Sequence, residues 1–125
     1  MGHLELVAEL TVPADPELLT VCRTTLAGVV AALPMSDTAL DDLKLVLSEV
    51  CGEAMERIGA AGGSVAIEFR RSRDELEVCV ADGGHEPTTG GLGLPLLRKL
   101  CSRLDVFPAA AGPGRIVRFA QTLPA

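Results

Sequence analysis

Three carboxylates gather on one short stretch of this chain. Glu49 and Glu53 are four residues apart, and Glu56 follows close by. Like charges one helical turn apart destabilise an isolated helix by about 0.2–0.5 kcal/mol. Arg57, four residues after Glu53, can pair with it and offset that cost. The carboxylates therefore either serve a chemical site or form a solvated acidic face, and their spacing leaves both alternatives open.

The carboxylates lie on a long helix that we predict to run to about Gly59. Apolar residues recur along it at three- and four-residue spacing and should face a core: Leu43, Val46, Leu47, Val50, Ala54 and Ile58. Three residues at its start are all good caps: Ser36, Asp37 and Thr38. The glycines at 62 and 63 break it.

A strand and a first helix precede this long helix. Residues 4–12 alternate as a half-buried strand does, with Leu4, Leu6, Ala8 and Leu10 on one face and Glu5, Val7, Glu9 and Thr11 on the other. Asp15 can cap the first helix, with Pro16 at its first position. We expect that helix to stop at Pro34.

Two hairpins and a third helix follow. Residues 64–71 and 76–82 alternate on either side of a charged turn, which predicts an antiparallel hairpin with one buried face. A glycine-rich loop over 83–91 leads to a helix predicted over 92–104. Residues 106–107 and 116–123 should form a second hairpin.

This order of elements predicts an α+β fold, a two-layer sandwich with the helices on one face of a mixed, mostly antiparallel sheet. The 125 residues, 48% of them hydrophobic, are enough for one domain over residues 1–125 and too few for two ordinary ones.

Composition excludes several classes of function. The formal net charge of −6, with no cluster of Lys and Arg, argues against binding to nucleic acid or to a membrane surface. No apolar run approaches the roughly 20 residues of a membrane span, and the first residues lack a basic segment followed by an apolar one, so we expect a cytoplasmic protein. The four cysteines are far apart in apolar stretches, so we expect buried, reduced thiols.

Three segments together resemble the GHKL ATPase superfamily, which includes gyrase and the histidine kinases. They are the helix segment 47–54, the strand end Val-Ala-Asp-Gly-Gly at 80–84, and the run Gly-Gly-Leu-Gly-Leu-Pro-Leu-Leu at 90–97. Within the superfamily the likeness is to the small anti-sigma-factor serine kinases of bacterial stress and sporulation switches. The resemblance implies a histidine-kinase-like ATPase fold over nearly the whole chain.

The resemblance implies roles for three acidic residues. Glu49 matches the general base near the γ-phosphate of ATP, acting on a partner's serine or on water. Asp82 matches the aspartate that accepts a hydrogen bond from the amine of adenine. Glu53 stands where the family has an Asn that holds Mg²⁺, and this chain contains no Asn. A carboxylate is also a hard oxygen ligand, so Glu53 is the metal candidate, although its charge beside a triphosphate alters the site.

The resemblance also implies roles for glycines in the loop. Gly84 matches a glycine that lets the backbone approach the base, and Gly91, Gly93 and Leu94 match the phosphate-side segment at a helix N-terminus. Alternatively, these glycines simply form a loop and a helix start. Glu86 replaces another family glycine, and the loop is short for a lid that closes over ATP. Together with Glu53, these departures point toward weak or absent nucleotide binding.

Two functions therefore remain open, and whether the protein is an enzyme remains open with them. In the first, it is an anti-sigma-factor-like regulator that binds a sigma factor, an anti-sigma antagonist or both, with binding of ATP and Mg²⁺ weakened or lost. In the alternative, it is an active ATP- and Mg²⁺-dependent serine-protein kinase that phosphorylates the antagonist. The resemblance also implies a homodimer that pairs through sheet edges and helices. An unrelated α+β domain with structural glycines is the third alternative.

Overall fold

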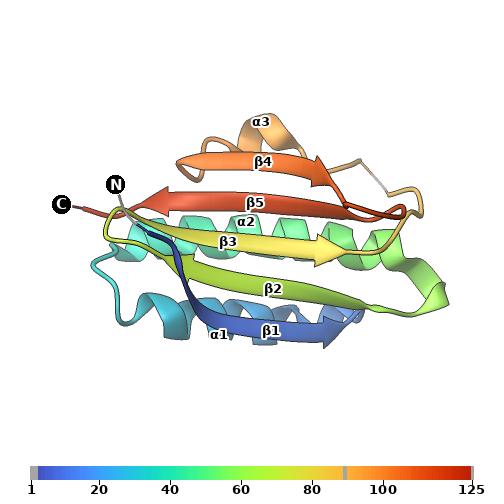
Figure 1. Cartoon of the computed structure of the whole chain (residues 1–125), viewed down its shortest axis with the longest axis horizontal. Coiled ribbons are helices and arrows are strands. Elements are labelled where there is room, and N and C mark those ends of the chain that lie inside the picture. The colour runs from blue at the N-terminus through green and yellow to red at the C-terminus, as the bar shows by residue number, and fades with distance from the viewer. Residues whose placement is uncertain (1–2, 89, 125) are drawn as a thin grey trace.

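The structure, a computed structural model, describes residues 3–88 and 90–124 and contains one five-stranded sheet (Figure 1). The strands lie in the order β1-β2-β3-β5-β4, and each neighbouring pair is antiparallel. Their bounds are Glu5–Pro13 for β1, Ser64–Arg71 for β2, Glu75–Asp82 for β3, Arg103–Pro108 for β4 and Arg115–Thr122 for β5. Both predicted hairpins are confirmed, and the second begins earlier than expected.

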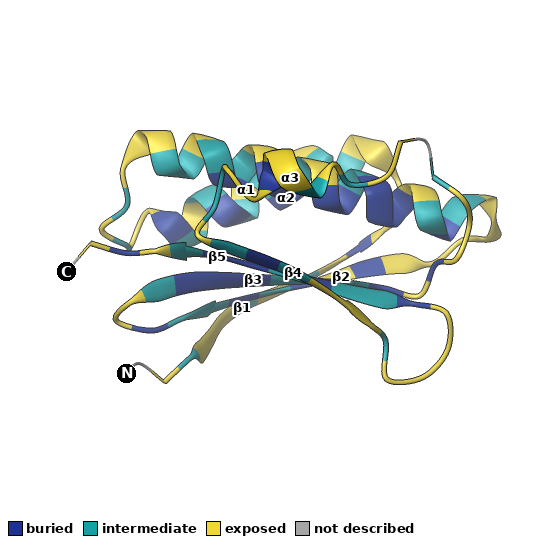
Figure 2. Cartoon of the chain, turned by 90° about the horizontal axis from the view of Figure 1, so that it is seen from above, coloured by how far each residue is buried: buried dark blue, intermediate teal, exposed yellow. Residues whose placement is uncertain are grey.

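The helices cover one face of this sheet (Figure 2). Their bounds are Leu19–Val30 for α1, Asp37–Ile58 for α2 and Leu94–Leu97 for α3, with short 3₁₀ helices η1 at Pro16–Leu18 and η2 at Gly59–Ala61. This arrangement confirms the predicted two-layer α+β fold with helices on one face. Among the described residues, none of these helices has the length and apolar character needed to span a bilayer.

The long helix α2 has the ends that its sequence predicts. The Ser36 side chain accepts a hydrogen bond from the Ala39 N–H at 3.1 Å, which satisfies one of the free donors of the first turn. The helix ends at Gly59, whose φ of 65° is a conformation that other residues rarely adopt. Asp15 likewise caps η1 by accepting from the Glu17 N–H at 3.0 Å.

The core lies between α2 and the sheet. The apolar stripe predicted for α2 is buried throughout, from Leu43 to Ile58. It packs on the inward side chains of the central strands, among which Phe69 and Phe119 are the largest fully buried residues. α2 is therefore held along its whole length, which fixes the position of any side chain on its other edge.

The first strand departs from its predicted alternation. Its pairing with β2 shifts between Leu6 and Ala8, as it does at a β-bulge. Ala8 and Leu10 are partly buried and Val12 is buried, whereas Leu6 and Val7 are both exposed. The alternation that placed Leu6 on one face with Ala8 and Leu10 therefore fails at Leu6, because the bulge interrupts the period of two.

The third helix is much shorter than predicted. α3 spans only four residues, and Leu104 belongs to β4 instead. The Ser102 N–H donates to the Ala120 carbonyl of β5 at 2.9 Å, which draws the chain into the sheet. Helical spacing over this segment predicts that Leu96, Leu97, Leu100 and Leu104 all face inward. Leu97 on the helix and Leu104 on the strand are buried, whereas Leu96 is 63% exposed, so the prediction for Leu96 is wrong.

Charged side chains cover the face of the sheet that lies away from the helices. Arg103 of β4 contacts Glu75 at 3.1 Å and Glu77 at 3.3 Å, although both carboxylates lie on β3 and β5 runs between these strands. The residue beneath this bridge is Ala120, the register partner of both Arg103 and Glu77. Ala120 is fully buried. On the same face, Arg118 lies 5.1 Å from the centre of the Phe107 ring.

Two leucines of α2 provide a test of this packing. Leu47 is fully buried, and Leu45 is 47% exposed. Leu47→Ala should lower the free energy of unfolding by about 2–5 kcal/mol because it opens a cavity in the core. Leu45→Ala should change it by less than about 0.5 kcal/mol. Urea titration followed by circular dichroism measures both values, and equal losses would contradict the assignment of the buried face.

Candidate functional site

A groove of about 460 Å³, called here the loop groove, lies at one end of the molecule. The C-terminal ends of α2 and β3 and the start of β5 come together at that end, beside the loop that follows β3 (Figure 1). The groove is lined by side chains from both helical and sheet layers, including Glu53, Arg57, Glu86, Leu94 and Arg115. Its size is within the range of small-molecule sites.

Glu53 lies at the base of the loop groove and is paired with an arginine. Only 8% of its side chain is exposed. Its Oε1 forms an ion pair with Nη2 of Arg115 on β5, and its Oε2 accepts no hydrogen bond from any described residue. The expected pair between Glu53 and Arg57 does not form, because the Arg57 side chain turns toward Asp82 instead.

Asp82 is covered by its partners and does not line the loop groove. Its Oδ1 accepts hydrogen bonds from the Gly84 N–H at 2.9 Å and from Nε of Arg57 at 3.3 Å. Its Oδ2 lies 3.8 Å from Nε of Arg115. Only 1% of the Asp82 side chain is exposed, so neither oxygen is presented to a ligand.

Arg57 also ties together segments that are far apart in the sequence. Its Nη2 donates to the Gly84 carbonyl at 2.6 Å and to the Pro113 carbonyl at 3.2 Å. Its own backbone carbonyl accepts from the N–H groups of His85 and Glu86 at 3.0 and 2.8 Å. The start of the loop is therefore fastened to the last turn of α2.

The structure gives a packing reason for the glycine at position 84. A Cβ atom there would overlap the backbone of Arg57 and Ile58. The residue must be glycine so that the loop can approach α2, whether or not a base ever lies against it. Gly114 has the same requirement, because a Cβ would overlap the carbonyl oxygen of Asp82.

The remaining predicted residues are only partly brought together. Gly91 and Leu94 line the loop groove with Glu53, whereas Glu49 is exposed on α2 outside the lining. Gly93 has a φ of 60° and caps α3. Because α3 has only four residues, the expected long helix with its N-terminus at these glycines is absent from the described residues, and so is most of its dipole.

The carboxylates at this end of the molecule do not fit adenine and Mg²⁺ in this arrangement. The carboxylate that would read the adenine amine is covered by Arg57 and Arg115. The carboxylate that would hold Mg²⁺ is paired with Arg115. Within residues 3–88 and 90–124, no three His, Cys, Asp or Glu side chains are grouped as metal ligands.

Sequence reasoning missed Arg115 as a residue of this site. It follows Gly114 at the start of β5 and is the register partner of Asp82 on β3. Register partners on one face of an antiparallel pair lie side by side, so the exact strand pairing would have placed the guanidinium beside the carboxylate. The sequence predicted the strands but not their register, because a long connection separates β3 from β5.

Comparisons with known proteins agree with this fold. A family model described as a histidine kinase-like ATPase domain matches residues 12–120. The serine-protein kinase RsbW of Bacillus subtilis (strain 168) is 38% identical over 78% of this chain and 76% of its own length. The serine-protein kinase RsbW of Bacillus pumilus (strain SAFR-032) is 32% identical with the same coverage.

A solved structure is similar over almost the whole chain. The crystal structure of RsbU and RsbW domains from Mycobacterium tuberculosis matches with a TM-score of 0.74 over 95% of this chain, at 17% identity. This chain spans about a third of that longer one, and at this identity the match bears on the fold alone. Family model, relatives and fold agree, and the chain belongs to the histidine kinase-like ATPase domain family.

Proposed function

We propose that this protein is an anti-sigma-factor-type regulator that acts by binding other proteins, and that its nucleotide binding is weakened or lost. Membership of the histidine kinase-like ATPase family and the RsbW relatives support the regulatory class. The coverage of Asp82 by Arg57 and Arg115 supports the loss of nucleotide binding.

Adenine recognition would have to compete with an internal ion-pair cluster. The amine of the base needs a carboxylate oxygen that is free to accept, and both oxygens of Asp82 already have partners. Displacing an arginine from a buried pair leaves an uncompensated charge, at a cost of about 3–5 kcal/mol. A loss of 3 kcal/mol lowers affinity by roughly a hundredfold.

Magnesium binding at Glu53 meets a similar obstacle. Arg115 pairs with Oε1 and brings a positive charge beside the only remaining oxygen, Oε2. Mg²⁺ prefers near-octahedral oxygen ligands, and a neighbouring guanidinium repels it. Glu53 with Arg115 thus replaces a metal-assisted phosphate site by an internal salt bridge.

Both edges of the sheet carry exposed apolar side chains that suit protein partners. Leu6 and Val7 lie on β1, and Val106 and Phe107 lie on β4. Edge strands also present backbone groups that can pair with another chain. These features support a homodimer that pairs through a sheet edge, and binding to a sigma factor or its antagonist.

The serine-protein kinase activity named for the relatives favours an active kinase as the second candidate. Glu49 is exposed one turn before Glu53 and makes no ion pair within the described residues, so its carboxylate is accessible to a partner. A calorimetric titration with nucleotide distinguishes the binding protein from the active kinase.

Calorimetric titration with ATP and ADP, each with and without Mg²⁺, should give no saturable binding at millimolar nucleotide. The physical reason is the competition between adenine and Arg57 and Arg115 for Asp82. Saturable micromolar binding that is abolished in Asp82→Ala would contradict the proposed loss of nucleotide binding and support the active kinase.

The variant Glu53→Asn with Arg115→Thr should gain Mg²⁺-dependent ATP affinity by at least about tenfold, a change of 1.4 kcal/mol. It removes the salt bridge and the guanidinium beside Asp82, and it supplies a neutral oxygen ligand. The matched control is Glu75→Asn with Arg103→Thr, which breaks an ion pair on the outer face of the sheet. No gain over this control in a folded protein would show that Arg115 and Glu53 do not limit binding.

Leu6→Lys should convert a dimer to a monomer, because a lysine on an edge strand opposes edge pairing. Leu45→Lys on α2 is the matched control, since both leucines are 47% exposed. Light scattering coupled to gel filtration gives the mass of each. A wild-type monomer, or a Leu6→Lys dimer as stable as the control, would remove the β1 edge from the proposed interface.

A further inference from the structure

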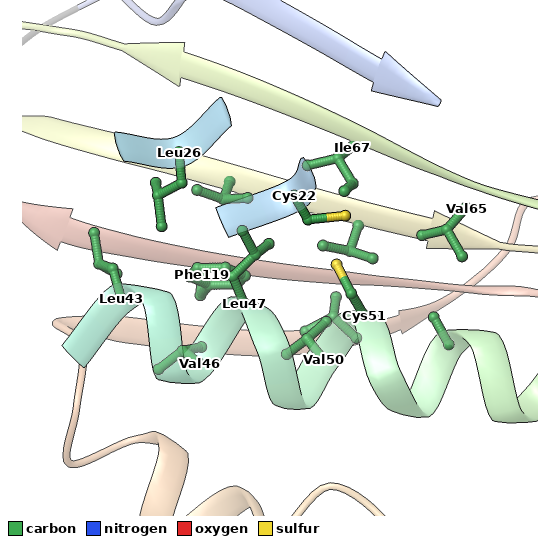
Figure 3. Close-up of a cluster of buried hydrophobic side chains, with 14 of the residues drawn as sticks. Cys22, Leu26, Leu43, Val46, Leu47, Val50, Cys51, Val65, Ile67 and Phe119 are labelled. Carbon is green, nitrogen blue, oxygen red and sulfur yellow. The ribbon is translucent and has the colours of Figure 1, made fainter. Parts of the chain in front are cut away.

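Two cysteines meet inside the contact between α1 and α2. Figure 3 shows the sulfur of Cys22 on α1 and the sulfur of Cys51 on α2 pointing toward each other. Both side chains are fully buried, and the two thiols are close enough to share a hydrogen bond. Both thiols are free in this structure. The pair is therefore placed for a reaction between its own members.

The two helices approach closely around this pair. Gly52 follows Cys51, and a Cβ atom built on it would lie 4.0 Å from Cδ1 of Leu19 on α1. Arg23, next to Cys22, donates to the Ser48 hydroxyl at 3.2 Å and also joins the helices. These side-chain contacts hold α1 against α2 beside the pair, and a disulfide needs such a fixed arrangement because its bond spans only a short distance between Cβ atoms.

The shared hydrogen bond makes the two thiols unequal. The Cys51 thiol lowers the pKa of Cys22 by hydrogen bonding to it, while burial acts in the opposite direction. The same hydrogen bond and burial raise the pKa of Cys51. Of the two thiols, Cys22 is the one whose pKa is lowered, and a thiolate is the form that reacts with oxidants.

We propose that Cys22 and Cys51 form a reversible disulfide that joins α1 to α2 when the protein meets a hydroperoxide. The Cys22 sulfur attacks the peroxide O–O bond and becomes a sulfenic acid, and the peroxide is reduced to water or an alcohol. The Cys51 sulfur then displaces the sulfenic hydroxyl as water and forms the S–S bond. One peroxide accepts the two electrons that the two thiols lose, and a small dithiol reverses the step by exchange.

The burial of the two sulfurs restricts their reaction to a small oxidant. Both sulfurs lie in the core, among apolar side chains such as Leu26, Leu47 and Ile67 (Figure 3). Hydrogen peroxide is small and neutral, whereas a bulky disulfide oxidant requires α1 to open. α1 has only 12 residues, so local opening of this helix is a second route.

The other two cysteines act as an internal control. Cys79 on β3 and Cys101 after α3 are partly exposed, and burial raises the pKa of each thiol. The Cys101 thiol donates to the backbone carbonyls of Leu97 and Arg103, and Cys79 lies beside Glu77. Neither has a cysteine partner in the described residues. If exposure alone determined which thiols react, Cys79 and Cys101 would be oxidised first.

The purified full chain is exposed to hydrogen peroxide, and its remaining thiols are then blocked. Its peptides are mapped without reduction of disulfides. The expected product is a Cys22–Cys51 peptide from a species that has not cross-linked to a second chain. The disulfide closes the chain from α1 to α2, so the thermal midpoint should rise by about 10 °C, and dithiothreitol should reverse the rise.

Cys51→Ala is the control variant, checked for folding by circular dichroism, and it should show no peroxide-dependent rise in its midpoint. Oxidation of Cys79 and Cys101 with no Cys22–Cys51 peptide would overturn the proposal. A Cys22–Cys51 peptide that leaves the wild-type midpoint unchanged or lower would overturn the claim that the bond joins two helices already in place. The wild-type peptide map shows whether the Cys22–Cys51 disulfide forms, even if the variant fails to fold.

Discussion

Two carboxylates that are removed from water, Asp82 and Glu53, constrain the end of the molecule where α2, β3 and β5 meet. A buried charge needs a partner, and each carboxylate has an arginine beside it. Those arginines come from different elements, Arg57 from the last turn of α2 and Arg115 from the first residue of β5. The positions of the loop, the hairpin and the helix end are therefore interdependent. Arg115 contacts both carboxylates, so a change at Arg115 leaves Glu53 without its partner and Asp82 with Arg57 alone.

The fold and the ion-pair cluster depend on different sets of contacts. The sheet, α2 and the glycine contacts at positions 84 and 114 depend on packing, which any member of the fold needs. The charges at positions 53 and 115 are complementary to each other and neutralise one another. Because Glu53 and Arg115 neutralise each other, neither charge requires a metal ion or a phosphate as its partner. Stability and ligand binding thus compete for the same side chains.

Sequence patterns predicted the fold well where one regular spacing of apolar residues continues over many residues. α2 and the β2–β3 hairpin have long apolar repeats and clear ends, and the structure confirms them. The third helix failed because leucines at helical spacing, Leu97 and Leu104, were drawn into different elements by a contact with β5. In the site, the family resemblance singled out Glu53 and Asp82, and the structure places both in contact with Arg115. Their arginine partners depend on strand register and on the path of a helix end, which are long-range properties that local patterns do not contain.

The bridge from Arg103 to Glu75 and Glu77 bears on how the sheet resists fraying. An edge strand is ordinarily held by one ladder of backbone hydrogen bonds and can peel away from its neighbour. Here the edge strand β4 also reaches over β5 to the central strand β3. Peeling β4 must therefore also break the contacts of Arg103 with Glu75 and Glu77 on β3. The short side chain of Ala120, which lies between Arg103 and Glu77, leaves room for this crossing.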